Sequence, residues 1–104
     1  MNKEEWQSLY NKLNNIYNEF RLVYLEFKYG SNEKIRSTAE RKLRPIISRA
    51  VFLITNNEDA FQLMLLDNSE TGRIGFLDEF KSPNYFESDL SHFLYLINEK
   101  IKTL

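Results

Sequence analysis

The sequence contains no cysteine and only one histidine, so two residue types that carry much protein chemistry are almost missing. Without cysteine the chain can form no disulfide bond, no thiolate nucleophile and no sulfur-ligated zinc site. The absence fits a reducing compartment. The N-terminal stretch also lacks the apolar core of a signal peptide. We therefore expect a cytoplasmic protein.

Glycine is scarce and long apolar runs are missing. The chain has only three glycines, and they form no phosphate-binding loop. No apolar run approaches the roughly 20 residues that a membrane-spanning helix needs. We therefore expect neither a nucleotide-binding loop nor a membrane span.

What remains is the composition of a soluble globular protein. Of the 104 residues, 42% are hydrophobic, 28% are charged and 14% are aromatic. A chain of this length corresponds to one domain, residues 1–104, that can bury roughly two thirds of its unfolded surface.

Apolar residues recur at helical spacing over most of this domain. The first stripe alternates spacings of four and three: Trp6, Tyr10, Leu13, Tyr17, Phe20, Tyr24 and Phe27. It follows a capping signal, Asn2 with Glu5, and predicts a helix that ends near Gly30. A second stripe from Ile35 to Ile54 predicts another helix after Ser31 or Asn32. Pro45 lies inside it, where the missing amide hydrogen predicts a kink.

The second half of the chain is less regular. "DAFQLMLLD" is apolar on all sides and predicts a short buried helix that begins after Asn56 or Asn57. Residues 67–82 have no clear period and predict a long loop. From Pro83 to the C-terminus the helical spacing returns, again with a capping signal. The fold class is therefore all-α, a four-helix bundle with a kinked second helix and a long loop before the last helix.

The residues that could carry catalysis are few. His92 has Asp89 three residues before it and Ser88 four residues before it, which places all three near one helical face. A working triad instead brings side chains from separate elements into a cleft beside an oxyanion hole. The stretch from Asp67 to Asp78 matches a calcium-binding loop at only a few positions. We expect no enzymatic activity, no metal and no cofactor.

Charge is unevenly distributed along the chain. Residues 31–55 carry six basic and two acidic side chains, whereas residues 56–104 carry four basic and nine acidic ones. The basic face of the second helix comprises Lys34, Arg41, Lys42, Arg44 and Arg49. Such a face is usually solvated, but it can also contact an acidic protein or, less favoured at a pI near 5.8, nucleic acid.

Apolar side chains also occur off the predicted core. Leu22 and Leu25 lie on the side of the first helix away from its stripe, and Phe76, Leu77 and Phe80 lie in the predicted loop. Two interpretations stay open: the loop folds over the first helix and buries both sets, or a partner covers them.

The sequence therefore favours a small non-enzymatic interaction or regulatory protein that self-associates. It could serve as an accessory or inhibitor protein of a bacterium or mobile element. The protein interface would comprise Leu22, Leu25, Phe76, Leu77 and Phe80. The alternative is a nucleic-acid-binding regulator that uses the basic face of the second helix.

Overall fold

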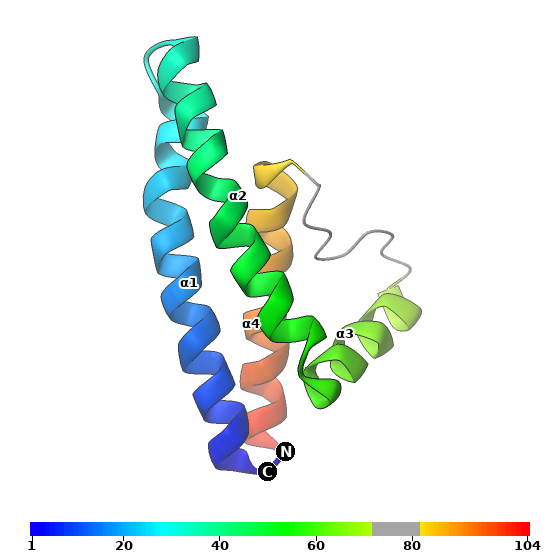
Figure 1. The fold of residues 1–104 in the computed structure, drawn as a ribbon. Coiled ribbons are helices and arrows are strands. Elements are labelled where there is room, and N and C mark those ends of the chain that lie inside the picture. The colour runs from blue at the N-terminus through cyan, green and yellow to red at the C-terminus, as the bar shows by residue number, and fades with distance from the viewer. Residues whose placement is uncertain (72–81) are drawn as a thin grey trace.

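The computed structural model describes residues 1–71 and 82–104, apart from the side chains of residues 69–71 (Figure 1). These residues form four α-helices: α1 (Lys3–Tyr29), α2 (Glu33–Thr55), α3 (Glu58–Thr71) and α4 (Pro83–Lys102). The predicted all-α helical bundle is therefore confirmed. The kink at Pro45 stays a prediction.

Asparagine side chains fix the starts of the first three helices. The side chain of Asn2 accepts a hydrogen bond from the Glu5 amide at 2.8 Å, and the Glu5 carboxylate accepts one from the Asn2 amide at 3.2 Å. Asn32 and Asn57 likewise accept from the backbone amides three residues ahead, at 2.9 and 3.0 Å. These bonds satisfy amides that have no partner within the helix, so each helix begins where the sequence places its cap.

The turn between α1 and α2 requires glycine because space is short there. Gly30 has φ −56°, so it does not use the left-handed conformation that glycine alone adopts easily. A Cβ atom at this position would lie 2.5 Å from the carbonyl oxygen of Glu26 and 2.9 Å from Cγ2 of Ile35. The first contact is with backbone, which cannot move aside without disturbing the end of α1.

Helix α1 is the centre of the bundle, because α2 and α4 both pack along it in the opposite chain direction (Figure 1). Helix α3 leaves the end of α2 at an angle. Helix α4 begins beside Tyr24, whose hydroxyl donates a hydrogen bond to Oδ1 of Asn84 at 2.7 Å. Beyond this level α1 and α2 continue as a two-helix hairpin, which we call the tip (residues 25–38).

The buried core lies between α1, α2 and α4 and is almost wholly apolar. Its largest fully buried side chains include Phe20, Phe86 and Phe93. The rings of Phe20 and Phe86 meet at a tilt, with 5.9 Å between centroids. The predicted stripes of α1, α2 and α4 supply most of this core, because a 3.6-residue period keeps them facing inward.

Three predictions about local structure are wrong. Helix α3 is not buried on all sides, since Leu65 and Leu66 are 42% and 56% exposed. The helix continues to Thr71, so residues 67–71 are helical and do not form the start of a loop. Ile35 was expected in the core but is 40% exposed. The physical reason is the same in both places. Among the described residues, α3 packs mainly on α2, and the tip consists chiefly of two helices, so each keeps an open side.

Candidate interaction surface

The outer face of α1 carries a row of exposed apolar side chains. Leu22, Leu25 and Tyr29 are 72%, 46% and 70% exposed, and their spacing of three and four places them on one face. We call these three residues the α1 stripe. The sequence predicted that Leu22 and Leu25 lie off the core, and the structure agrees. Tyr29 was not among the predicted interface residues, although its spacing of four from Leu25 is the signal that would have placed it there.

The α1 stripe has a polar continuation and charged borders. Towards the start of α1 the same face carries exposed asparagines, Asn11, Asn15 and Asn18. Glu19 and Glu26 flank the face on the α2 side, where they pair with Arg49 at 2.6 Å and Lys42 at 4.0 Å. Arg21 and Lys28 flank it on the α4 side, over the rings of Tyr17 and Tyr24 at 5.9 Å each. The stripe is therefore bordered by acid–base pairs on its α2 side and by basic side chains on its α4 side.

The remaining predicted interface residues, Phe76, Leu77 and Phe80, lie outside the described residues. The interpretation that they cover Leu22 and Leu25 concerns a segment that the structure does not describe.

The predicted basic face of α2 is largely paired with glutamates of the α1–α2 hairpin. Lys42 and Arg49 pair with α1, as described above, and Arg44 pairs with Glu40 one turn earlier at 3.0 Å. Arg41 donates to the hydroxyl of Thr38 at 3.4 Å. Exposed pairs of this kind contribute little to stability, but they lower the positive potential that a phosphate backbone would meet.

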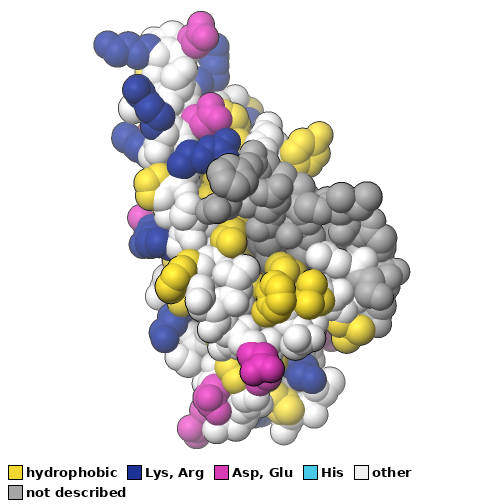
Figure 2. Space-filling model, turned by 45° about the vertical axis from the view of Figure 1, so that its right-hand side comes forward, with side chains coloured by type: hydrophobic (Ala, Val, Ile, Leu, Met, Phe, Trp, Pro, Cys, Tyr) yellow, Lys and Arg dark blue, Asp and Glu magenta, His cyan; other side chains and the backbone are white. Residues whose placement is uncertain are grey.

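Lysine and arginine side chains do gather at the tip. Figure 2 shows them at the upper end of the molecule, with fewer acidic side chains among them. Lys28, Lys34 and Arg36 lie in this region and are exposed, and Arg36 donates to the carbonyl of Gly30 at 2.8 Å. Within residues 25–38 these three basic side chains stand beside two acidic ones, Glu26 and Glu33.

His92 does not meet the partners that its sequence neighbours suggested. Its Nε2 lies 3.1 Å from Oδ1 of Asp67 on α3, a residue 25 positions away. Ser88 is exposed, whereas Asp89 is buried on the same helix. The histidine is about one quarter exposed and its carboxylate partner is nearly buried. This pair joins α3 to α4, so its evident role is to hold the two helices together.

Metal ligation gains no support in the part of the chain that the structure describes. No group of three or more acidic or histidine side chains there could hold an ion. The predicted partial calcium loop begins at Asp67, but this residue belongs to α3, and the stretch up to Asp78 runs beyond the described residues.

Two tyrosines of α1 connect the bundle to α4. Tyr17 donates a hydrogen bond to Oε1 of Glu87 at 2.6 Å, and Tyr24 donates to Asn84. Burial raises the pKa of Tyr17 above its usual value, and the hydrogen bond to the Glu87 carboxylate raises it further. The hydroxyl therefore stays protonated and keeps donating well into alkaline solution.

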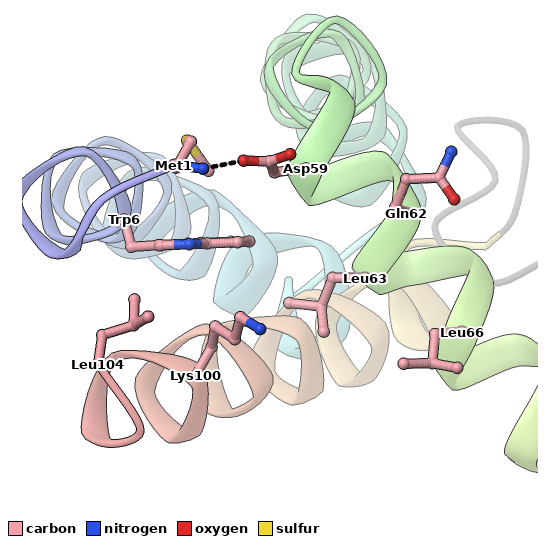
Figure 3. A pocket seen from close by; sticks show the side chains of 8 residues that line it. All are labelled: Met1, Trp6, Asp59, Gln62, Leu63, Leu66, Lys100 and Leu104. Carbon is pink, nitrogen blue, oxygen red and sulfur yellow. Dashed lines mark hydrogen bonds and ion pairs between the residues drawn. The ribbon is translucent and has the colours of Figure 1, made fainter.

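Two shallow cavities lie away from the α1 stripe. One, with a volume of about 370 Å³, lies between the start of α1, helix α3 and the end of α4 (Figure 3). Its residues are Met1, Trp6, Asp59, Gln62, Leu63, Leu66, Lys100 and Leu104, and the Met1 ammonium pairs with Asp59 across it. The other, about 450 Å³, lies on α1 and α2 beside Phe52, which is 64% exposed. Neither was predicted, because each collects residues from elements that are distant in the sequence.

No described helix is long and apolar enough to cross a membrane. Comparison with protein-family models, with characterised proteins and with solved structures finds no match to this chain. Functional inference therefore depends on the surface itself.

Proposed function

We propose that this chain is a small non-enzymatic protein that acts through protein–protein contact and associates with a second copy of itself. The main support for this proposal is the α1 stripe. Its three large apolar side chains form one exposed row on the most central helix of the bundle. Among the described residues, these three side chains stay outside the core between α1, α2 and α4. Contiguous apolar patches with charged borders are typical of contact sites.

The size of the stripe sets the strength of the contact. Full burial of a leucine or aromatic side chain stabilises by about 1.5–3 kcal/mol, so covering the exposed parts of six such side chains contributes about 6–12 kcal/mol. Association itself costs about 4–15 kcal/mol. The two ranges overlap, so the dimer is expected to be weak; where the gain exceeds the cost by about 4–5.5 kcal/mol, the Kd is on the order of 0.1–1 mM. Such a contact suits a regulatory or accessory protein whose state depends on its local concentration.

Sedimentation velocity of the full chain tests the proposal. Between about 10 µM and about 1 mM, the range that spans the expected Kd, the weight-average sedimentation coefficient should rise towards that of a dimer. The variant Leu22→Glu with Leu25→Glu should stay monomeric at every concentration. Because both positions are exposed, its circular dichroism spectrum should match that of the parent chain.

A matched control carries the same added charge on other helices. Gln62→Glu with Asn98→Glu places two glutamates at exposed positions of α3 and α4, away from the outer face of α1. This variant should associate like the parent chain. A parent chain that remains monomeric at the highest concentration would refute self-association, and an equal effect of both variants would show that net charge, and not the stripe, is responsible.

A nucleic-acid-binding regulator is the second hypothesis, favoured by the concentration of basic side chains at the tip (Figure 2). The glutamates that pair with Lys42, Arg44 and Arg49 count against it. Fluorescence anisotropy with labelled single- and double-stranded nucleic acid decides the matter. Tight binding that weakens steeply with salt would support the hypothesis, and no binding at low salt would remove it.

A further inference from the structure

The α1 stripe follows the heptad spacing of a coiled-coil seam. If Leu22 and Tyr29 occupy position a of successive heptads, Leu25 occupies position d, and Asn15 and Asn18 take the preceding a and d positions. The exposed outer face of α1 is therefore a seam that is apolar in its second half and amide-rich in its first half.

The charged borders give this seam a direction. In this register Glu19 and Glu26 occupy the e positions, and Arg21 and Lys28 occupy the g positions. When two such helices pair in parallel, each g residue faces the e residue five positions later on the other helix. When they pair antiparallel, e faces e and g faces g. Parallel pairing of two copies thus brings Arg21 to Glu26 of the other copy, and antiparallel pairing places the basic g residues of the two copies against each other.

The groups needed for the parallel contact are accessible. The side chain of Glu26 is 54% exposed, and its contact with Lys42 inside the chain is long, at 4.0 Å. Arg21 is exposed, and its guanidinium lies over the Tyr17 ring, 5.9 Å from the ring centroid. Each copy can therefore offer Arg21 to Glu26 of the partner copy, and the two-fold axis repeats the pair. Asparagines at a and d also favour an in-register parallel pair, since each then meets its own amide.

We infer that two copies of this chain associate side by side through the α1 stripe, with their α1 helices parallel, in register and related by a two-fold axis. The tips of both copies then point in the same direction, and their basic side chains form one shared surface. This inference rests on the proposed self-association and adds the orientation of the partner.

The absence of cysteine from the chain makes a direct test simple. In the parallel arrangement residue 18 faces its own copy, at the Cα separation of about 5.5–6.5 Å that a disulfide accepts. In an antiparallel arrangement centred on Leu25, the two copies of residue 18 lie about 21 Å apart along the helices, at a rise of 1.5 Å per residue. Asn18→Cys should therefore form a disulfide-linked dimer rapidly under mild oxidation only in the parallel case. The control Gln62→Cys, exposed on α3 and far from the seam, should not.

Two further variants make the outcome unambiguous. Adding Leu22→Glu and Leu25→Glu to Asn18→Cys should abolish the cross-link. Arg21→Glu should raise the Kd by about tenfold or less, because each exposed ion pair contributes modestly and the Arg21–Glu26 pair occurs twice in the dimer. The charge-swapped variant Arg21→Glu with Glu26→Arg should restore the parent Kd.

The failures of the two proposals can be told apart. If the parent chain forms a stripe-dependent dimer but Asn18→Cys does not cross-link, self-association stands and the parallel orientation is overturned. If Arg21→Glu strengthens the dimer, the orientation is likewise overturned, because the antiparallel pair would have been relieved of like charges. If no dimer forms at any concentration, both proposals fall.

Discussion

Replacing Phe86 by alanine should cost this protein a large part of its stability. Phe86 is fully buried at the start of α4 and packs on Phe20, which is also fully buried. Truncating a buried phenylalanine to alanine costs about 3–5 kcal/mol, because transfer free energy is lost and a cavity is left. Domains of this size are stable by about 5–15 kcal/mol in total, so the variant should fold but with a much smaller margin.

Urea denaturation measures this loss and at the same time tests whether the chain is one cooperative unit. With a urea dependence of about 1–3 kcal/mol per molar, the midpoint should fall by roughly 2 M. Trp6 is the only tryptophan and is 3% exposed. It lies about 20 Å along α1 from Phe20 at a rise of 1.5 Å per residue. Its fluorescence therefore reports on the far end of the bundle, and circular dichroism reports on all four helices.

In a single cooperative domain both signals should shift together. The control Tyr85→Ala removes a neighbouring aromatic side chain that is 66% exposed and should cost about 1 kcal/mol or less. A loss below about 1 kcal/mol for Phe86→Ala would refute the packing described for α4. A shift of the circular dichroism signal without a shift of the fluorescence signal would refute the single domain.

Three further outcomes are expected. Gly30→Ala should lower the free energy of unfolding by about 1–3 kcal/mol, the usual cost of overpacking. The reason is that the new Cβ would meet the Glu26 carbonyl oxygen. An unchanged free energy of unfolding in chemical denaturation would contradict the tight turn. The raised pKa of Tyr17 contributes stability that is present below about pH 10 and is lost as pH rises through the pKa of the folded state. Tyr17→Phe lacks this group, so the variant should lose less stability above about pH 10 than the parent chain. Equal alkaline slopes would contradict this. Arg41→Glu with Arg44→Glu should leave anisotropy with nucleic acid unchanged at physiological salt, and a loss of binding would restore the nucleic-acid hypothesis.

The sequence was sufficient to predict features that depend on local chemistry. The cap at Asn2, the end of α1 at Gly30 and the inward faces of α1, α2 and α4 all follow from residues within one or two turns of one another. The exposure of Leu22 and Leu25 follows from the same periodicity, since a residue off the apolar stripe faces away from the core.

Features that depend on the relative placement of helices could not be predicted. Nothing near His92 in the sequence indicates Asp67, because their contact depends on the angle between α3 and α4. The exposure of Leu65 and Leu66 has the same origin, since an apolar helix carries no sign of how many neighbours will cover it.

The tip has a thermodynamic consequence of its own. Residues 25–38 lie at the end of the bundle where α4 contributes only its first turn, so their backbone hydrogen bonds should open locally at a small fraction of the global unfolding free energy. Amide exchange should therefore be slow around Phe20 and progressively faster towards Gly30. The α1 stripe crosses this gradient, with Leu22 on firm structure and Tyr29 on the part that opens. Any molecule that binds the whole row must also order its outer end, so slower exchange at the tip would accompany binding and would report its occupancy residue by residue.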